Sequence, residues 1–375
     1  MPPISLLIKP ASSLCNLRCR YCFYHSIAEN RLTESYGIMD YDTLETLVKK
    51  TLEFADNNCT IAFQGGEPTL AGIDFYKKLI ELEKKYNVKN VSINNAIQTN
   101  GIVIDDEWAS FLAKNNFLVG LSLDGPKDIH DASRVDHIKK GTFNKVMNTV
   151  NLFNKHKVEY NILFVVDAFV ARHVKKVYNF FKKNNFKYLQ YIPCLDPLGE
   201  EPGNYEYSLT PERLSYFMRN LFDEWYNDFM NDNYISIRYF DNLVGMVLGH
   251  PPEACGMSGI CSCQFVVEAD GGVYPCDFYV LDEWYLGNLK DSSFEELKFS
   301  ENGKRFVEVS KHQSPECLKC HWFGICRGGC RRNREPFANG NPVLNHYCSA
   351  YREFFEYAAE RIEKVAQKVA SMQRP

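Results

Sequence analysis

The sequence predicts an α/β fold in which a series of strand–helix units precedes a second, cysteine-rich domain and a C-terminal helix. Three observations support this. Short apolar runs alternate with segments of helical periodicity through the first half of the chain. Nine of the fourteen cysteines lie from Cys255 onward. The last stretch, residues 350–372, combines alternating charge with an apolar stripe, which is typical of a helix that packs against the rest of the fold.

The first half of the chain reads as about six strand–helix units. The expected strands are 4–8, 60–63, 91–98, 117–123, 160–166 and 188–192. The expected helices between them are 42–54, 74–86, 105–114, 143–156 and 174–184. This alternation predicts parallel strands joined by right-handed crossovers. Because a closed barrel of this kind needs eight units, we expect a partial (β/α)6 barrel with functional groups at the C-terminal ends of its strands.

The remainder of the chain changes in character after the last of these strands. Residues 196–250 contain a Pro/Gly loop and two helical stretches, 211–230 and 242–248, and we interpret them as a helical linker region. The expected parts are therefore a partial barrel over 1–195, the linker region over 196–250, a cysteine-rich domain over 251–348 and a C-terminal helix over 349–375.

Composition excludes several classes of protein. The formal net charge of -4 gives no electrostatic basis for binding nucleic acid or an anionic membrane. The apolar run at the N-terminus is too short for a signal peptide, and no run has the length of a membrane span. A chain of 375 residues can bury its own core without disulfides, so clustered cysteines predict metal ligands in a reducing, anoxic cytoplasm.

Three cysteines with the spacing C-x3-C-x2-C follow the first strand: Cys15, Cys19 and Cys22. A four-iron cluster is held by cysteine thiolates, so three ligands leave one iron open to a small molecule. The alternatives are a zinc knuckle, which usually needs four ligands, and chance cysteines. The spacing, together with the aromatic Tyr21, resembles the signature of the radical S-adenosylmethionine (SAM) enzymes, in which the open iron chelates the amino and carboxylate groups of SAM.

That resemblance implies further SAM contacts, each of which has a plain alternative as a turn, capping or surface residue. The segment Gly65-Gly66-Glu67-Pro68 follows a strand, and by resemblance Gly66 contacts the methionine amino group. A hydroxyl at a strand end suits the ribose, and an arginine fork suits the carboxylate. The remaining candidates are Ser122 for the ribose, Arg134 for the carboxylate, Gln98 as a weaker contact of the same kind, and Leu195 with the backbone beside Tyr21 for the adenine.

The cysteines of the second domain follow a more specific pattern. Residues Cys261, Gly271 and Cys276 fit C-x9-G-x4-C, and a second run fits C-x2-C-x5-C-x3-C, followed by one more cysteine: Cys317, Cys320, Cys326, Cys330 and Cys348. The whole pattern resembles the SPASM domain of peptide-modifying radical SAM enzymes. With Cys255 it supplies eight thiolates, enough for two four-iron clusters without an open iron. Two zinc sites in a folding module remain the structural alternative.

The division of these ligands between two auxiliary clusters does not follow from spacing. By resemblance, the first cluster is held by Cys255, Cys261, Cys276 and Cys330. The second is held by Cys317, Cys320, Cys326 and Cys348. The three surplus cysteines, Cys59, Cys194 and Cys263, are interpreted as small buried hydrophobic residues.

Nearly the whole chain is similar to the anaerobic sulfatase-maturating enzymes, through the triad, the segment SLDGP at 122–126, the cysteine block and the segment YPCDFYV at 274–280. This resemblance implies three [4Fe-4S] clusters, SAM, and oxidation of a cysteine or serine in a C/S-x-P-x-R segment to Cα-formylglycine. A 5′-deoxyadenosyl radical takes hydrogen from Cβ, and a base removes the heteroatom proton. The resemblance points to Asp277 as that base, although an aspartate there could also be a cap or turn residue.

The implied partners are an unfolded or nascent sulfatase and a one-electron donor of the flavodoxin or ferredoxin type. Two other functions stay open at this point: another SPASM maturase that forms thioether or carbon–carbon links, and a multi-cluster electron carrier that never cleaves SAM. The sequence alone leaves the choice between cysteine and serine substrates open.

Overall fold

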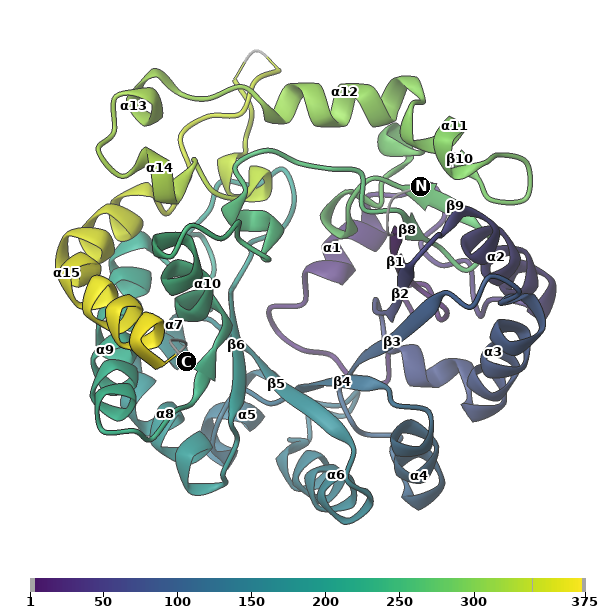
Figure 1. Cartoon of the computed structure of the whole chain (residues 1–375), viewed down its shortest axis with the longest axis horizontal. Helices are drawn as coiled ribbons and strands as arrows, with labels where there is room; N and C mark the ends of the chain where they lie inside the picture. Colours follow the sequence, from purple (N-terminus) through teal and green to yellow (C-terminus); the bar gives the residue numbers. More distant parts are fainter. Residues whose placement is uncertain (1–3, 339, 373–375) are drawn as a thin grey trace. The chain divides into compact units, whose positions relative to one another are not determined.

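The computed structural model describes residues 4–338 and 340–372 and confirms the α/β class (Figure 1). The strands are β1 (Ile4–Ile8), β2 (Asn58–Phe63), β3 (Ser92–Thr99), β4 (Leu118–Ser122), β5 (Glu159–Val166), β6 (Tyr188–Pro193), β7 (Ser236–Ile237), β8 (Val266–Val267), β9 (Gly272–Tyr274) and β10 (Gly287–Asn288). The helices are α1 (Phe23–Glu29), α2 (Tyr41–Phe54), α3 (Ile73–Tyr86), α4 (Asp106–Lys114), α5 (Lys127–Ser133), α6 (Phe143–His156), α7 (Ala168–Arg172), α8 (Val174–Lys183), α9 (Pro211–Met230), α10 (Arg238–Val247), α11 (Phe294–Lys298), α12 (Glu301–Ser310), α13 (Pro315–Leu318), α14 (Phe323–Cys326) and α15 (Cys348–Met372).

The described chain divides into two compact units that do not follow the order of the sequence. The first unit contains residues up to 122 together with 134–160 and 262–306. The second contains 123–133, 161–261 and the residues from 307 onward. The expected domain boundaries at 195, 250 and 348 stay a prediction.

The first unit is built on a sheet with the strand order β10-β9-β8-β1-β2-β3-β4. The strands β1 to β4 are parallel neighbours, as the alternation of strands and helices predicted. Alternate residues of β1 are buried, because the sheet is covered by the apolar faces of helices such as α2. Helix α2 begins where the Asp40 carboxylate accepts a hydrogen bond from the backbone N–H of Thr43 at 2.7 Å, a standard N-cap.

The cysteine-rich part of the sequence contributes strands to this same sheet. Strand β8 pairs in parallel with β1, so that Leu7 lies opposite Val266, and β9 and β10 follow as antiparallel neighbours. Two-residue strands leave too short a pattern for recognition from sequence. As a result, the loop after β9 belongs to the same compact unit as the cysteine triad after β1.

The second unit contains most of β5, which pairs in parallel with β6, and β6 pairs in parallel with β7. Helix α9 has the predicted bounds, with Pro211 at its first position. The expected C-terminal helix is α15, which packs beside α9 (Figure 1). The ring centroids of Phe222 and Phe354 are 5.6 Å apart, and Arg361 pairs with Asp223 at 2.8 Å.

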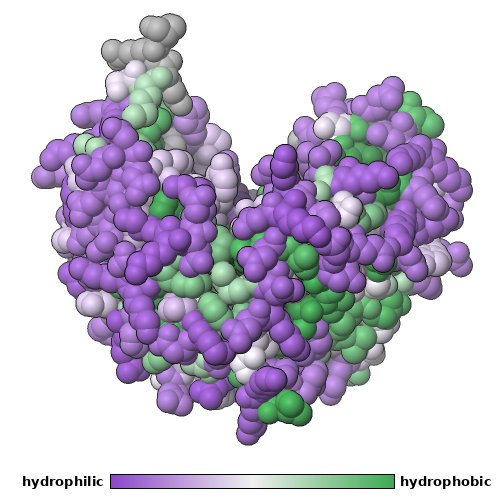
Figure 2. Space-filling view, turned by 90° about the horizontal axis from the view of Figure 1, so that it is seen from below, coloured by the Kyte–Doolittle hydropathy of each residue, from purple (hydrophilic) through white to green (hydrophobic). Residues whose placement is uncertain are grey.

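Hydrophilic residues cover most of the face shown in Figure 2, with hydrophobic residues between them. Among the helices of residues 4–338 and 340–372, none combines the length and the apolar character that crossing a bilayer requires.

Candidate active site

The cysteine triad lies in the loop between β1 and α1, in the first unit. Cys22 is the residue before the first turn of α1, and the main-chain N–H of Leu17 donates to the Cys15 Sγ at 3.4 Å. Burial raises the pKa of the Cys15 thiol to about 12, while the positive charge of Arg134 acts in the opposite direction. Cys15 also lines a cavity of about 540 Å³, with Arg18 and His25 among its other lining residues. The thiols are therefore clustered near a cation and beside open space, as ligands of an iron–sulfur group must be.

The segment after β2 docks directly on the triad loop. Gly66 has φ = +54°, and a Cβ placed on it would lie 2.2 Å from the carbonyl oxygen of Leu14. The next residue, Glu67, donates its main-chain N–H to that same oxygen at 2.7 Å. Because only glycine accepts both the left-handed backbone and the close approach, Gly66 has a defined structural reason to be glycine.

The Glu67 carboxylate lies behind this contact and is only 1% exposed. It accepts hydrogen bonds from the main-chain N–H and hydroxyl of Thr69 at 3.1 and 2.6 Å, and from the hydroxyl of Thr99 at 2.7 Å. A fourth bond comes from the main-chain N–H of Asn100 at 2.7 Å. Burial raises the pKa of Glu67 and these hydrogen bonds oppose that shift. The carboxylate thereby ties the Gly-Gly-Glu segment to the end of β3.

Four of the six predicted SAM contacts form two pairs within the first unit. The Gln98 amide, near the end of β3, donates to the Ser122 hydroxyl at the end of β4 at 3.1 Å. The Arg134 guanidinium lies over the Tyr21 ring, 5.5 Å from its centroid. Gly66 contacts the triad loop in the same unit, whereas Leu195 is a half-buried residue after β6 in the second unit.

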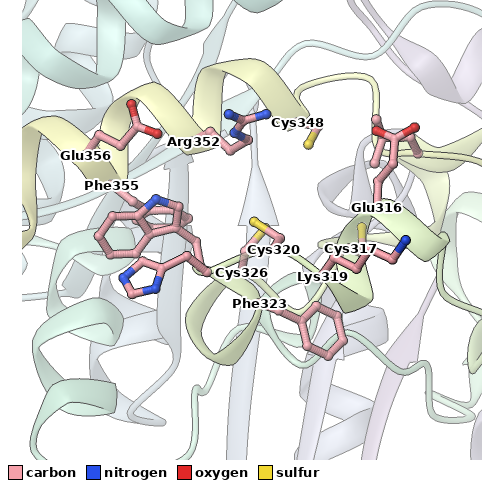
Figure 3. A pocket seen from close by; sticks show the side chains of 14 residues that line it. Glu316, Cys317, Lys319, Cys320, Phe323, Cys326, Cys348, Arg352, Phe355 and Glu356 are labelled. Carbon is pink, nitrogen blue, oxygen red and sulfur yellow. The ribbon is translucent and has the colours of Figure 1, made fainter.

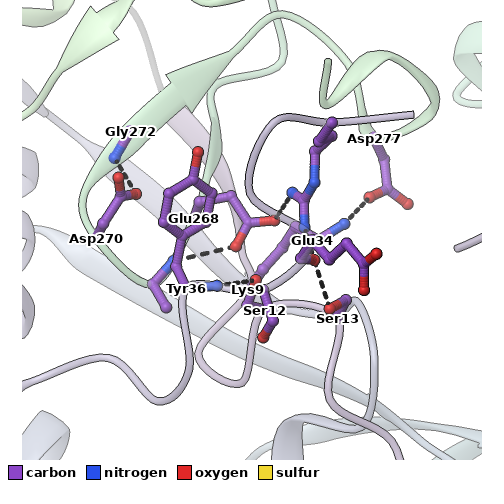
Figure 4. Close-up of polar contacts among 12 residues, drawn as sticks. Lys9, Ser12, Ser13, Glu34, Tyr36, Glu268, Asp270, Gly272 and Asp277 are labelled. Carbon is purple, nitrogen blue, oxygen red and sulfur yellow. Dashed lines mark hydrogen bonds and ion pairs between the residues drawn. The ribbon is translucent and has the colours of Figure 1, made fainter. Parts of the chain in front are cut away.

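The Asp277 carboxylate contacts three side chains of the first unit, and Figure 4 shows one of these contacts, the ion pair with Lys9. It accepts a hydrogen bond from the Tyr24 hydroxyl at 2.5 Å and one from the Gln64 amide at 3.2 Å. It also forms an ion pair with the Lys9 ammonium at 3.4 Å, in which the side chains are 12% and 3% exposed. Burial, followed by the nearby Asp277 charge, holds the pKa of Tyr24 well above its usual value, so this phenol stays a donor.

Lys9 is placed to neutralise this network. Its ammonium lies 4.4 Å from the centroid of the Tyr24 ring, which adds a cation–π contact to the ion pair with Asp277. The Gln64 amide donates to the Tyr24 hydroxyl at 2.8 Å. A partly buried carboxylate held by a cation and two neutral donors keeps one orientation, which a proton acceptor requires.

Four cysteines of the second unit line one cavity of about 440 Å³ (Figure 3). The short helical turns α13 and α14, the link between them and the start of α15 supply the four cysteines: Cys317, Cys326, Cys320 and Cys348. Arg352 and Trp322 are among the other residues that line the cavity. These are the four residues that the sequence assigned to the second auxiliary cluster, and the structure brings them together.

Three of the four cysteines assigned to the first auxiliary cluster also gather in the second unit. A Cβ on Gly256 would lie 3.6 Å from the Cβ of Cys330, so the turn at Cys255 lies beside Cys330. Burial, together with the smaller effect of the Cys255 and Cys261 charges, raises the pKa of the Cys330 thiol to about 12. Cys276 belongs to the first unit. Within residues 4–338 and 340–372, no three His, Cys, Asp or Glu side chains gather around the position of a single metal ion.

The comparisons with known proteins agree with these two clusters of thiols. Residues 10–181 match the family model of the radical SAM superfamily, and residues 255–321 match an iron–sulfur cluster-binding domain called SPASM. The chain is 55% identical to a Cys-type anaerobic sulfatase-maturating enzyme of Clostridium perfringens, over 98% of this chain and 100% of that protein. The chain belongs to the anaerobic sulfatase-maturating enzymes.

Two further similarities place the chain within the anaerobic sulfatase-maturating enzymes. A Ser-type enzyme of Bacteroides thetaiotaomicron is 33% identical over 100% of this chain and 94% of its own length. A solved structure of native anSMEcpe with bound AdoMet and a Cp18Cys peptide has a TM-score of 0.95 and 54% identity, covering 98% of this chain and 100% of that one. The predicted fold class, family and radical SAM enzyme class are confirmed. As a member of both matched families, the enzyme uses iron–sulfur clusters and SAM.

Sequence reasoning found the thiols of this sulfatase-maturating enzyme but missed the neighbours of Asp277. Lys9 is a charged residue at the end of a buried strand, and Gln64 directly precedes the Gly-Gly-Glu segment. Their positions in the sequence could therefore have marked both as candidate site residues. One interpretation was wrong: Cys263 is half-buried, while Cys59 and Cys194 are buried as expected.

Proposed function

We propose that this enzyme oxidises a cysteine of a sulfatase, within a C-x-P-x-R segment, to Cα-formylglycine. The observation that carries the proposal is the Asp277 carboxylate, directly after Cys276, oriented by Tyr24, Gln64 and Lys9. Preference for cysteine over serine is supported by the much higher identity to the Cys-type relative than to the Ser-type one. The peptide named in the similar solved structure supports a polypeptide substrate.

The proposal includes three [4Fe-4S] clusters. The triad Cys15, Cys19 and Cys22 would hold the cluster with an open iron. The two auxiliary clusters would take the eight cysteines of the second domain, divided as the family resemblance implies, and the cavity shared by Cys317, Cys320, Cys326 and Cys348 supports the second of them. When bound, SAM and the first cluster supply a 5′-deoxyadenosyl radical that takes one hydrogen atom from the substrate Cβ.

Around SAM, the proposed contacts are those that the sequence singled out. Gly66 gives SAM room beside the triad loop, since a side chain there would collide with the loop. The Gln98–Ser122 pair presents a hydroxyl and an amide that can bind the ribose, and Arg134, which stacks on Tyr21, can pair with the carboxylate. Leu195 is proposed for the adenine.

The base is proposed to act on the substrate thiol. Asp277 would take the S–H proton after hydrogen is lost from Cβ, and loss of one further electron, for which an oxidised auxiliary cluster would be the acceptor, would complete a C=S bond. Water then replaces sulfur and hydrogen sulfide is released, which gives the aldehyde. Lys9 pairs with the carboxylate, and Tyr24 and Gln64 keep it oriented. Reduction of the first cluster requires an external donor of the flavodoxin or ferredoxin type.

We also propose a cytoplasmic location, where the enzyme would bind the sulfatase while that chain is unfolded or nascent. All fourteen cysteines are free thiols in the structure, which suits a reducing compartment. The proposal involves neither nucleic acid nor a membrane.

The test is anaerobic incubation of the reconstituted enzyme with SAM, a reductant and a C-x-P-x-R peptide, followed by mass spectrometry. Matched peptides carry Ser or Ala at the target position. We expect the mass change of a –CH2SH group that becomes –CHO, with the Ser peptide slower and the Ala peptide unchanged. In the Cys peptide, a stable product that has lost only two hydrogens would instead indicate a thioether or carbon–carbon crosslink and would refute the proposal.

A second experiment tests the assignment of the first cluster. Replacing Cys15, Cys19 and Cys22 together with Ala should abolish SAM cleavage and lower the iron content from about twelve to about eight per chain, because a four-iron cluster is lost. Retained cleavage of SAM in this triple variant would place the reactive cluster elsewhere.

A further inference from the structure

The side chain of Asn100 contacts the cysteine triad. Asn100 is neither one of the proposed SAM contacts nor part of the network around the proposed base. Asn100 directly follows β3 and is 7% exposed. Its amide nitrogen lies 3.8 Å from the Cys15 Sγ and 2.8 Å from the Asn16 Oδ1. The two protons of the amide therefore have two acceptors, one of which is the sulfur of a proposed cluster ligand.

The orientation of this amide is fixed by its other end. The Asn100 Oδ1 accepts a hydrogen bond from the main-chain N–H of Ile102 at 3.0 Å. A main-chain N–H can only donate, so the oxygen must face Ile102 and the NH2 group must face Cys15. The reversed amide would set a donor against a donor at Ile102.

The backbone of Asn100 is also held in place. Its main-chain N–H donates to the Glu67 carboxylate, which also accepts hydrogen bonds from the Thr69 and Thr99 hydroxyls. The neighbouring Glu67 N–H holds the Leu14 carbonyl, directly before Cys15. The donor and the sulfur are thus mounted on the same hydrogen-bonded framework, so their separation does not depend on a mobile side chain.

We propose that Asn100 tunes the reduction potential of the first cluster by donating its amide N–H to the Cys15 thiolate. The inference rests on the proposed function, since it takes Cys15 as a cluster ligand. A reduced cluster carries one more negative charge than an oxidised one, and a hydrogen bond to a ligand sulfur stabilises that added charge. Asn100 therefore makes the cluster easier to reduce and acts as a positioning residue, without touching the substrate.

The test compares midpoint potentials in the full-length, reconstituted enzyme. Asn100→Leu removes the donor without adding charge, and Asn100→Asp removes it while keeping the acceptor for Ile102. The matched control is Asn94→Asp, which makes the same chemical change at an exposed position on the same strand. Iron content and thermal unfolding are recorded for each variant, and a potentiometric titration follows the electron paramagnetic resonance signal that SAM perturbs.

We expect both Asn100 variants to shift that midpoint to more negative potential at full iron content, while Asn94→Asp titrates as wild type. In D2O, the coupling of an exchangeable deuteron to the cluster should weaken in both Asn100 variants. Wild-type potentials in both variants would overturn the inference, and so would a shift in Asn100→Asp alone, which would be an effect of added charge. If SAM perturbs no cluster in the wild-type enzyme, the proposed function itself fails, and the two failures are distinguishable. Should Asn100→Leu lose iron, the deuteron coupling in Asn100→Asp decides the question: a weakened coupling supports the inference and an unchanged one overturns it.

Discussion

The substitution Asp277→Asn should separate radical formation from product formation. It preserves the shape of the side chain and its capacity to accept from Tyr24, but removes the charge that accepts a proton and faces Lys9 at 3.4 Å. Loss of a general base typically costs at least about 10²-fold in rate. At 1.36 kcal/mol for each factor of ten, this is about 2.7 kcal/mol of lost transition-state stabilisation.

The same substitution has a structural cost that can be measured separately. Lys9 is 3% exposed, so it would keep a buried charge with only the Tyr24 ring beside it. Leaving a buried charge without its partner costs about 2 kcal/mol here, below the range for fully buried pairs because Asp277 is 12% exposed. The variant should therefore unfold at a lower temperature yet still bind iron.

The assay measures 5′-deoxyadenosine and formylglycine in the same anaerobic reaction. We expect the variant to release deoxyadenosine while formylglycine drops by about 10²-fold or more. Asp282→Asn is the matched control, since Asp282 is an exposed carboxylate close by in sequence that only caps the Leu32 N–H. Formylglycine at a near wild-type rate would show that another group is the base, and loss of bound iron would show that Asp277 is structural.

Two other substitutions test the surrounding framework. Gly66→Ala should abolish SAM binding, because its Cβ meets a carbonyl oxygen at 2.2 Å. Gly72→Ala has the same sign of φ with nothing within 4 Å of the added Cβ, so it should cost about 1–3 kcal/mol of stability and leave SAM binding intact. Calorimetric SAM titration and thermal unfolding distinguish the two variants, and equal SAM affinity in both would refute the steric argument. Burial raises the pKa of Glu83 to about 7 despite the Asn95 hydrogen bonds, so its contribution to stability is present below its unfolded pKa and is lost as pH rises to about 7. Glu83→Gln should therefore flatten the fall of the unfolding temperature between about pH 4.5 and 7 and stabilise the protein at pH 8 by about 3 kcal/mol, and an unchanged slope would contradict this.

The parts that the sequence predicted well depend on local patterns. The strands and helices of the first half follow from periodicity, and helix α9 has the expected bounds because Thr210 and Pro211 mark its start. The cysteines are recognisable because their spacing is fixed by short loops. Helix α1, with seven residues and two buried positions, was not predicted since so short a segment carries almost no periodic signal.

The parts that were missed depend on contacts between distant residues. Tyr24 and Gln64 reach Asp277 only because β8 pairs with β1 and brings the loop after β9 to the triad side of the sheet. No local rule predicts a parallel pair of two residues each. The Glu67 carboxylate was seen only as part of a glycine motif, and its four donors come from three separate positions of the fold.

The pairing of β8 with β1 also has a consequence for how the chain is made. The edge of β1 at Leu7 stays uncovered until Val266 has been synthesised. At ribosomal rates of 5–20 residues per second, this takes roughly 10–50 s. During this time the first strand exposes unpaired main-chain groups that invite association with other chains. Asp277, the proposed base, emerges later still, so a nascent chain could acquire its first cluster well before it can turn a substrate radical into product.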